Sequence, residues 1–210
     1  RVGGIDLILK EQYTTVQGTI ANGVTPSHVL AVHGTEGDCQ LLRPKELFCD
    51  PACTAGTTCD DNSACIPLPT NQNVGTVQIT GLSAAVEMEA RPPVYFYNFV
   101  GDLPHPGFTA GATLGLSASG EDIGEFSLGT IGVAKLQVTT ESMALERSQN
   151  AVLDWKLTDT DARAKVVIEV NIANHGGTPG RILCETDDSG HFEISSVLVN
   201  ELLDLGYSGF

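Results

Sequence analysis

Six cysteines limit what this chain can fold into more than any other feature of its sequence. Four of them, Cys49, Cys53, Cys59 and Cys65, fall within seventeen residues. The residues between them are small, polar or turn-forming, and such a segment buries too little apolar surface to order itself without covalent links. A zinc site is the alternative, but zinc-binding cysteines usually come as two matched, closely spaced pairs. We therefore predict disulfides, and with them an oxidising compartment.

The pairing of the six cysteines is open from sequence alone, because fifteen combinations exist. Chain economy favours crossed pairs inside the cluster, which would form a compact knob. The two remaining cysteines would then close a loop of most of the chain and restrict the unfolded state by about 4–5 kcal/mol in the chain-entropy model. The pairs expected on this ground are Cys49–Cys59, Cys53–Cys65 and Cys39–Cys184.

Short stretches of alternating apolar and polar residues recur along the chain. In the first of them, Ile5, Leu7 and Leu9 share one face, as in a half-buried strand. Further strands are expected near residues 17–20, 29–32, 74–79, 94–100, 111–117, 124–128, 132–140, 151–157, 164–172, 181–184 and 192–194. The chain ends differently, because Ser195 or Ser196 can cap a short helix over 197–205.

Many short strands separated by turn signals are typical of an all-β sandwich. We predict a single antiparallel β-sandwich or jelly-roll-like domain over residues 1–210, with a short C-terminal helix. The cysteine-rich segment, residues 39–69, is expected as a disulfide-rich insertion within that domain.

The chain is strongly acidic, with 11 Lys and Arg against 26 Asp and Glu and a formal net charge of −15. This sign disfavours binding to nucleic acid and to anionic membranes, whose phosphates attract basic proteins. No apolar run approaches the ~18 residues of a transmembrane segment. The acidity fits a solubilised extracellular protein, or one that supplies carboxylates to Ca²⁺.

The predicted location is secreted, extracellular or at the outer cell surface, with the periplasm as an alternative. The chain starts at Arg1 and shows no signal-peptide core, so we expect that a leader was removed. It contains no Asn-x-Ser/Thr acceptor for N-glycosylation, which favours a bacterial source.

Two groups of segments carry a resemblance. They are Gly37–Leu42, Phe48–Cys53 and Val74–Leu82 in the first half, and Leu153–Trp155, Ile182–Cys184 and Asp188–Phe192 in the second. Together they resemble uncharacterised secreted proteins and lipoproteins of myxobacteria and related bacteria. The resemblance covers half to two-thirds of the chain. It implies a secreted or lipoprotein-like, β-sandwich-like domain with a Cys-rich insertion, and it carries no functional residues.

Catalytic signatures are missing from the sequence. The segment Gly115–Gly120 contains two serines, but not the Gly-x-Ser-x-Gly spacing of a nucleophile elbow. His28 and His33 are five apart and face opposite sides of a strand. We therefore predict that the protein is not an enzyme, and a secreted hydrolase is a disfavoured alternative.

Acidic turns offer candidate calcium ligands. Asp159, Asp161, Asp187 and Asp188 place carboxylates in turns, where backbone carbonyls can join them. None of these segments matches a complete calcium-binding loop. The alternative is that they are solvated turn residues, since Asp favours such positions in any case.

The aromatic run Val94–Val100 is the most suggestive binding feature. Tyr95, Tyr97 and Phe99 would share one face and form a flat strip for a sugar or a partner protein, while the alternate positions fill the core. The alternative is that both faces are buried. Trp155 alternates with leucines and is expected in the core.

The function favoured by these features is a non-catalytic extracellular or cell-surface protein that acts through protein–protein contacts or self-assembly. A carbohydrate-binding module, assisted by calcium, is the runner-up.

Overall fold

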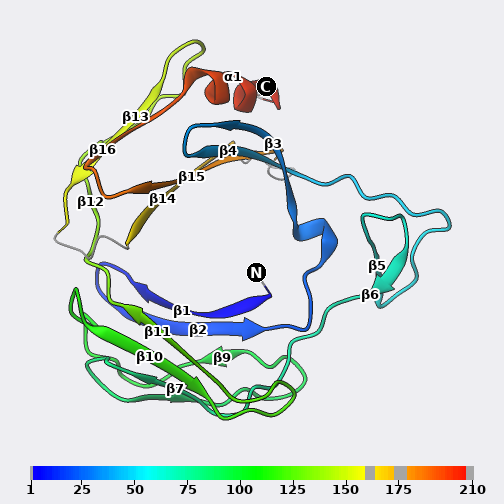
Figure 1. The fold of residues 1–210 in the computed structure, drawn as a ribbon, viewed down its shortest axis with the longest axis vertical. Coiled ribbons are helices and arrows are strands. Elements are labelled where there is room, and N and C mark those ends of the chain that lie inside the picture. Colours follow the sequence, from blue (N-terminus) through cyan, green and yellow to red (C-terminus); the bar gives the residue numbers. More distant parts are fainter. Residues whose placement is uncertain (1, 159–163, 173–178, 207–210) are drawn as a thin grey trace. The chain divides into compact units, whose positions relative to one another are not determined.

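The chain forms two compact all-β units. A computed structural model describes residues 2–158, 164–172 and 179–206. Unit 1 combines Arg1–Thr25 with Pro67–Lys135, and unit 2 combines Pro26–Ile66 with Leu136–Phe210. All strand pairs within the described sheets are antiparallel (Figure 1).

Unit 1 contains two sheets. The first has the strand order β1-β2-β9, with β1 at Gly3–Leu9, β2 at Thr14–Ile20 and β9 at Tyr97–Asn98. The second has the order β11-β10-β7-β8, with β7 at Val77–Thr80, β8 at Val86–Met88, β10 at Thr113–Ala118 and β11 at Phe126–Ile131.

One apolar cluster joins the two sheets of unit 1. Val16 and Tyr97 contribute from the first sheet, and Val77, Val86 and Ala118 from the second. Their inward side chains alternate with outward polar ones along β7, where Val77 and Ile79 are buried. This is the arrangement of two sheets that pack face to face.

Unit 2 also contains two main sheets, together with a helix. One sheet has the order β12-β13-β16, with β12 at Gln137–Val138, β13 at Ala151–Lys156 and β16 at His191–Ile194. The other has the order β14-β15-β4-β3, with β3 at Leu30–Glu36, β4 at Cys39–Pro44, β14 at Lys165–Asn171 and β15 at Arg181–Asp187. A 3₁₀ turn, η1, lies at Pro26–His28, and β5 (Thr57–Cys59) pairs with β6 (Cys65–Pro67).

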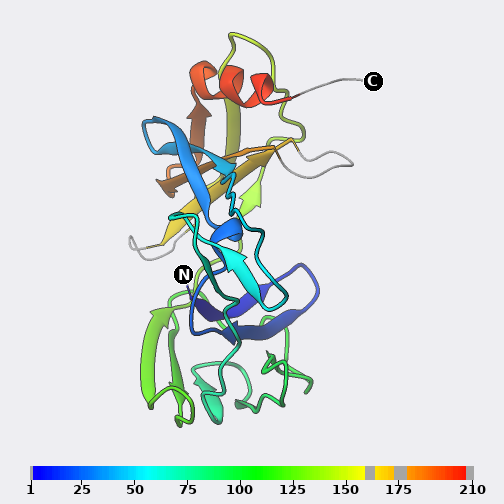
Figure 2. The ribbon, with the colours of Figure 1, turned by 90° about the vertical axis from the view of Figure 1, so that its right-hand side faces the viewer.

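The core of unit 2 lies between these sheets and helix α1, which spans Ser196–Asp204. The helix begins after Ser195, whose side chain accepts a hydrogen bond from the Val197 amide. Leu198 and Leu202, one turn apart, are buried against the sheet of β3, β4 and β15. Figure 2 shows α1, in red, beside the ends of β13 and β16. The predicted cap and helix are confirmed.

The all-β, antiparallel prediction is also confirmed, but the predicted single domain differs from the two units of the structure. The sandwich-like arrangement occurs twice, once in each unit. Each unit is assembled from two separated stretches of chain. The crossing after residue 66 coincides with the linker-like stretch Pro67–Pro69, but no composition change marks the crossings after residues 25 and 135, so the sequence indicates only one of the three.

The three predicted disulfide pairs are present. Cys39–Cys184 joins directly opposite residues of β4 and β15, with Cα atoms 4.0 Å apart. The other two pairs are Cys49–Cys59 and Cys53–Cys65. Cys39 therefore belongs to a core strand, and the disulfide-rich knob begins after β4, later than the predicted start of the 39–69 insertion.

No helix in the described part of the chain is long and apolar enough to cross a membrane.

Candidate functional site

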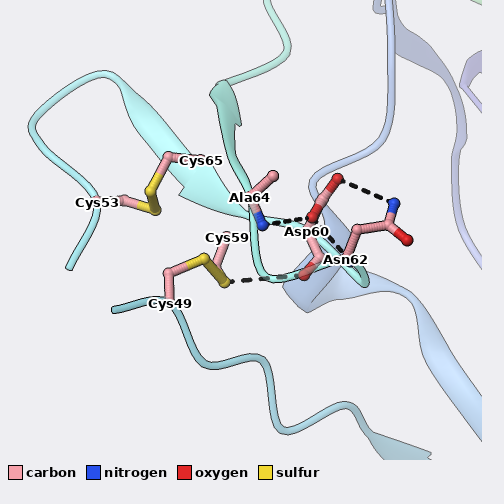
Figure 3. The surroundings of a disulfide bond; sticks show 7 residues. All are labelled: Cys49, Cys53, Cys59, Asp60, Asn62, Ala64 and Cys65. Atoms are coloured by element: carbon pink, nitrogen blue, oxygen red, sulfur yellow. Dashed lines mark hydrogen bonds between the residues drawn. A yellow bond between two sulfur atoms is a disulfide. The ribbon is translucent and has the colours of Figure 1, made fainter. Parts of the chain in front are cut away.

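The knob is a rigid projection of unit 2. Its two disulfides cross-link the loop before β5 to β5 and β6 (Figure 3). The Asp60 carboxylate accepts hydrogen bonds from the amides of Asn62 and Ala64, at 2.8 and 2.9 Å. These bonds hold the pKa of Asp60 below its ordinary value. Within the described residues every cysteine is disulfide-bonded, so the knob sulfurs are not free ligands.

The aromatic strip predicted from the sequence is wrong. Tyr97 is fully buried, and Phe99 packs against the same core. Tyr95 is half-buried. The outward positions are instead Val94 and Val100, which are 60% and 88% exposed. The face expected to bind a ligand is therefore the face that fills the core of unit 1.

Local turns set this orientation. Before the strand, the Tyr95 amide donates to the Arg91 carbonyl, and Tyr95 itself has a positive φ of 44°. Only Tyr97 and Asn98 pair as a strand. The Tyr97 hydroxyl accepts from the Val74 amide at 2.9 Å, and this satisfied polar end lets the whole ring be buried. Burial raises the pKa of the phenol above its ordinary value.

The two described candidate calcium ligands do not converge. Asp187 pairs with Lys165. The Asp188 carboxylate instead accepts from the indole Nε1 of Trp155 at 2.7 Å and from the amide of Thr158 at 2.9 Å. Among the described residues, no His, Asp or Glu forms a three-ligand group with them. Asp187 is the last residue of β15 and Asp188 lies in the bend that follows, and the two carboxylates have different partners.

The other two candidate ligands, Asp159 and Asp161, lie outside the described residues. The predicted core position of Trp155 is confirmed, because this side chain is 4% exposed.

Most edge strands of the protein are protected against pairing with another chain. An edge presents unpaired N–H and C=O groups, and charges, bulges or short length normally discourage a partner strand. Strands β8, β9, β12, β5 and β6 have two or three residues. The longer edge strands β1, β3, β14 and β16 carry charged side chains, namely Asp6, Glu36, Lys165, Glu169 and Glu193, and β3 also has a bulge.

A charge cluster reinforces this protection at β16. The two ring nitrogens of His191 lie 2.7 Å from the Asp154 carboxylate and 3.4 Å from that of Glu193. These hydrogen bonds, first the one to Asp154 and then the one to Glu193, raise the pKa of His191 above its ordinary 6.5. A strand approaching this edge would have to pass three polar groups.

Strand β11 is the exception. Among the described edge strands longer than three residues, it alone has no charged side chain. It pairs with β10 over six residues without a bulge. Residues 127–130 are exposed, and Figure 2 shows β11, in light green, at the margin of its sheet.

The bonding pattern shows which backbone groups of β11 are open. In the register of this pair, Gly132 lies opposite Ala112 and donates to its carbonyl at 2.8 Å. Counted from Gly132, every second residue of β11 hydrogen-bonds to β10, so these bonds are made by the even-numbered residues. Ser127, Gly129 and Ile131 therefore direct their N–H and C=O groups to the open edge.

The core-facing side of β11 is also left uncovered. Leu128 lies opposite Leu116, which lies opposite the buried Ile79, so all three side chains share the inner face of the sheet. Phe126 on the same face packs against the core, but Leu128 is 64% exposed. The core of unit 1 therefore reaches β11 at Phe126 but leaves Leu128 uncovered.

The opposite face of this sheet holds a shallow polar groove of about 520 Å³. Hydroxyl and amide side chains line it, including Thr76, Gln78, Ser117 and Ser119, with Glu125 at one side. The groove can offer hydrogen bonds, and its one aromatic lining residue, Phe126, packs against the core.

No protein-family model, no curated protein and no solved structure matches the chain. The resemblance to secreted bacterial proteins therefore stays a prediction.

A strand was expected near 124–128, but its role as an open edge was not. Residues 126–134 contain no charged residue, but this signal is weak, because residues 62–86 and 103–120 are longer uncharged runs. The position of this strand at a sheet edge depends on long-range pairing, which periodicity does not reveal.

Proposed function

We propose that this protein is a non-catalytic module, secreted or exposed at the cell surface, that accepts an extended strand of a protein partner at the β11 edge. The observation that carries the proposal is an uncharged, six-residue edge strand whose inner face leaves Leu128 uncovered. Strand addition at such an edge gains main-chain hydrogen bonds from the partner and packs its alternate side chains.

The oxidising compartment of this proposal is supported by three disulfides. Such bonds form and persist in oxidising compartments, such as the outside of the cell. An unguarded edge that is kept under these conditions is a candidate binding element, because it is otherwise an aggregation hazard.

Carbohydrate binding is supported by the polar groove alone. The aromatic platform expected for stacking sugars is not formed at the surface, because Tyr97 is buried. Protein contact is therefore the better supported function.

A peptide titration tests strand addition. The probe is a synthetic peptide of residues 124–132, added to the isotope-labelled full chain at low protein concentration. We expect the amides of Ser127, Gly129 and Ile131 to shift and to gain exchange protection, because they face the open edge. Amides of the even-numbered residues, which already bond to β10, should gain much less.

Two variants make the titration specific. Ser127→Pro removes one edge-facing N–H without touching the bonds to β10, so it should weaken binding by about tenfold, the loss of roughly one backbone hydrogen bond. Thr130→Ala keeps every backbone group of the strand and should bind like the wild type. Absence of binding, or equal effects on both amide sets, would contradict the proposed function.

A further inference from the structure

We infer that the strand received at the β11 edge is β11 of a second copy of the chain, paired antiparallel about a two-fold axis at Leu128. This inference rests on the proposed function and identifies its partner. The paired edges would continue the sheet from one unit 1 into the next, with both apolar faces on the same side.

Side chains of β11 alternate between the inner and outer faces of the sheet, and this limits the registers in which two copies of the strand can pair. A two-fold axis perpendicular to the sheet keeps the two inner faces on one side, so inner residues must lie opposite inner residues. With the axis at Leu128, Ser127 lies opposite Gly129 of the second copy, and the reverse. These are the residues whose backbone groups are open, so they can exchange both hydrogen bonds of a closely bonded pair.

The side chains favour this register over its neighbour. At the centre, Leu128 lies opposite its own copy, and Phe126 lies opposite Thr130. The 64% of Leu128 that is exposed in one chain would then be covered by an equivalent leucine. A register shifted by one residue in each chain places Leu128 opposite Thr130 and loses the leucine–leucine contact.

Charge opposes a second copy less at this edge than elsewhere on the surface. Two chains with a formal charge of −15 repel each other over most approaches. The paired strands, from Phe126 to Ile131, contain no charge at all. The nearest acid, Glu125, would lie opposite Ile131 rather than another acid. The short interface predicts a weak, concentration-dependent dimer, since six residues bury far less than a standard interface.

Single cysteine variants test the pairing and its register. In the proposed dimer the two Leu128 Cα atoms form a pair about 4.5 Å apart. The protein's own Cys39–Cys184 bond joins directly opposite strand residues at 4.0 Å. Leu128→Cys should therefore form a disulfide-linked dimer under mild oxidation, measured by non-reducing gel and peptide mapping.

The control is Thr130→Cys, which lies on the same face of the same strand. Its two copies would be roughly 13 Å apart, beyond disulfide reach. We expect at least about tenfold more linked dimer for Leu128→Cys than for Thr130→Cys, because a disulfide needs Cα atoms within about 7 Å.

Four other results would overturn the inference. Preferential linking of Gly129→Cys would show the shifted register. Equal linking of all three variants would show random collision. If no variant links while the peptide still binds at the edge, the second copy is excluded and the proposed strand-accepting function stands. If no variant links and the peptide does not bind, both the second copy and the strand-accepting function are excluded.

Discussion

Replacing Cys39 and Cys184 together by alanine should destabilise unit 2 by about 5 kcal/mol, since this disulfide closes a loop of 145 residues. The bond joins β4 to β15 in the centre of a sheet and of the core. It also links the two separated chain segments that build the unit. Without it, folding must close the entire intervening chain, including the Pro67–Lys135 stretch of unit 1, as an unlinked loop.

The only tryptophan gives a direct readout of this effect. Trp155 is buried in unit 2, so its fluorescence during guanidinium denaturation reports the unfolding of that unit. The matched control replaces Cys53 and Cys65, whose loop is short and confined to the knob. We expect the control to leave the Trp155 transition close to wild type. Equal shifts for both double variants would contradict the assignment of Cys39–Cys184 as the bond that holds unit 2.

Tyr97→Ala should destabilise unit 1 by about 3–5 kcal/mol, the usual cost of deleting a buried aromatic side chain. Tyr97 is fully buried between the two sheets, and its hydroxyl group lies 3.0 Å from the Gly75 carbonyl. Tyr97→Phe keeps the ring but leaves the Val74 amide without its partner, so it should cost about 1–3 kcal/mol.

Amide hydrogen exchange measures the stability of unit 1 separately from that of unit 2 in this experiment. Slowly exchanging amides of β7 and β10 should lose protection in the order wild type, Tyr97→Phe, Tyr97→Ala. The fluorescence transition of Trp155 in unit 2 serves as the internal control and should shift far less. If Tyr97→Phe matched the wild type, the hydroxyl would not be the buried anchor described above.

Local patterns in the sequence predicted many of the strands, because each depends on nearby residues. They missed β4 and β8, and the strands expected at 94–100 and 132–140 are only two residues long in the structure. The alternation of Ile5, Leu7 and Leu9 corresponds to β1, and Ser195 caps α1 as its spacing indicates. Chain economy also chose the correct knob pairs, since Cys49–Cys59 and Cys53–Cys65 need no knowledge of the rest of the fold.

Features that depend on distant partners were not predictable in this way. The direction of Tyr97 follows from the Val74 amide, more than twenty residues earlier in the chain. The Asp188 carboxylate accepts a hydrogen bond from the indole of Trp155, because a strand far away in sequence brings a buried donor to it. The division into two units depends on which separated segments pack together, and local composition does not encode this.

The β11 edge depends partly on local sequence and partly on distant partners. The sequence contains the uncharged run and predicts a strand there, but only the strand order shows that one side of it is open. Comparing all edges then makes the absence of charge on β11 meaningful, because the other long edges carry acids or lysine.

The solution mass as a function of protein concentration tests the central claim most directly. Light scattering of the wild type should rise from 22.1 kDa towards twice that mass as concentration increases. Leu128→Lys, which places like charges opposite each other at the centre of the pair, should stay at 22.1 kDa throughout. Val167→Lys adds the same charge at a similarly exposed valine of the β14 edge and should behave like the wild type. A wild type that remains monomeric at every concentration, or an association that Leu128→Lys leaves unchanged, would contradict the account.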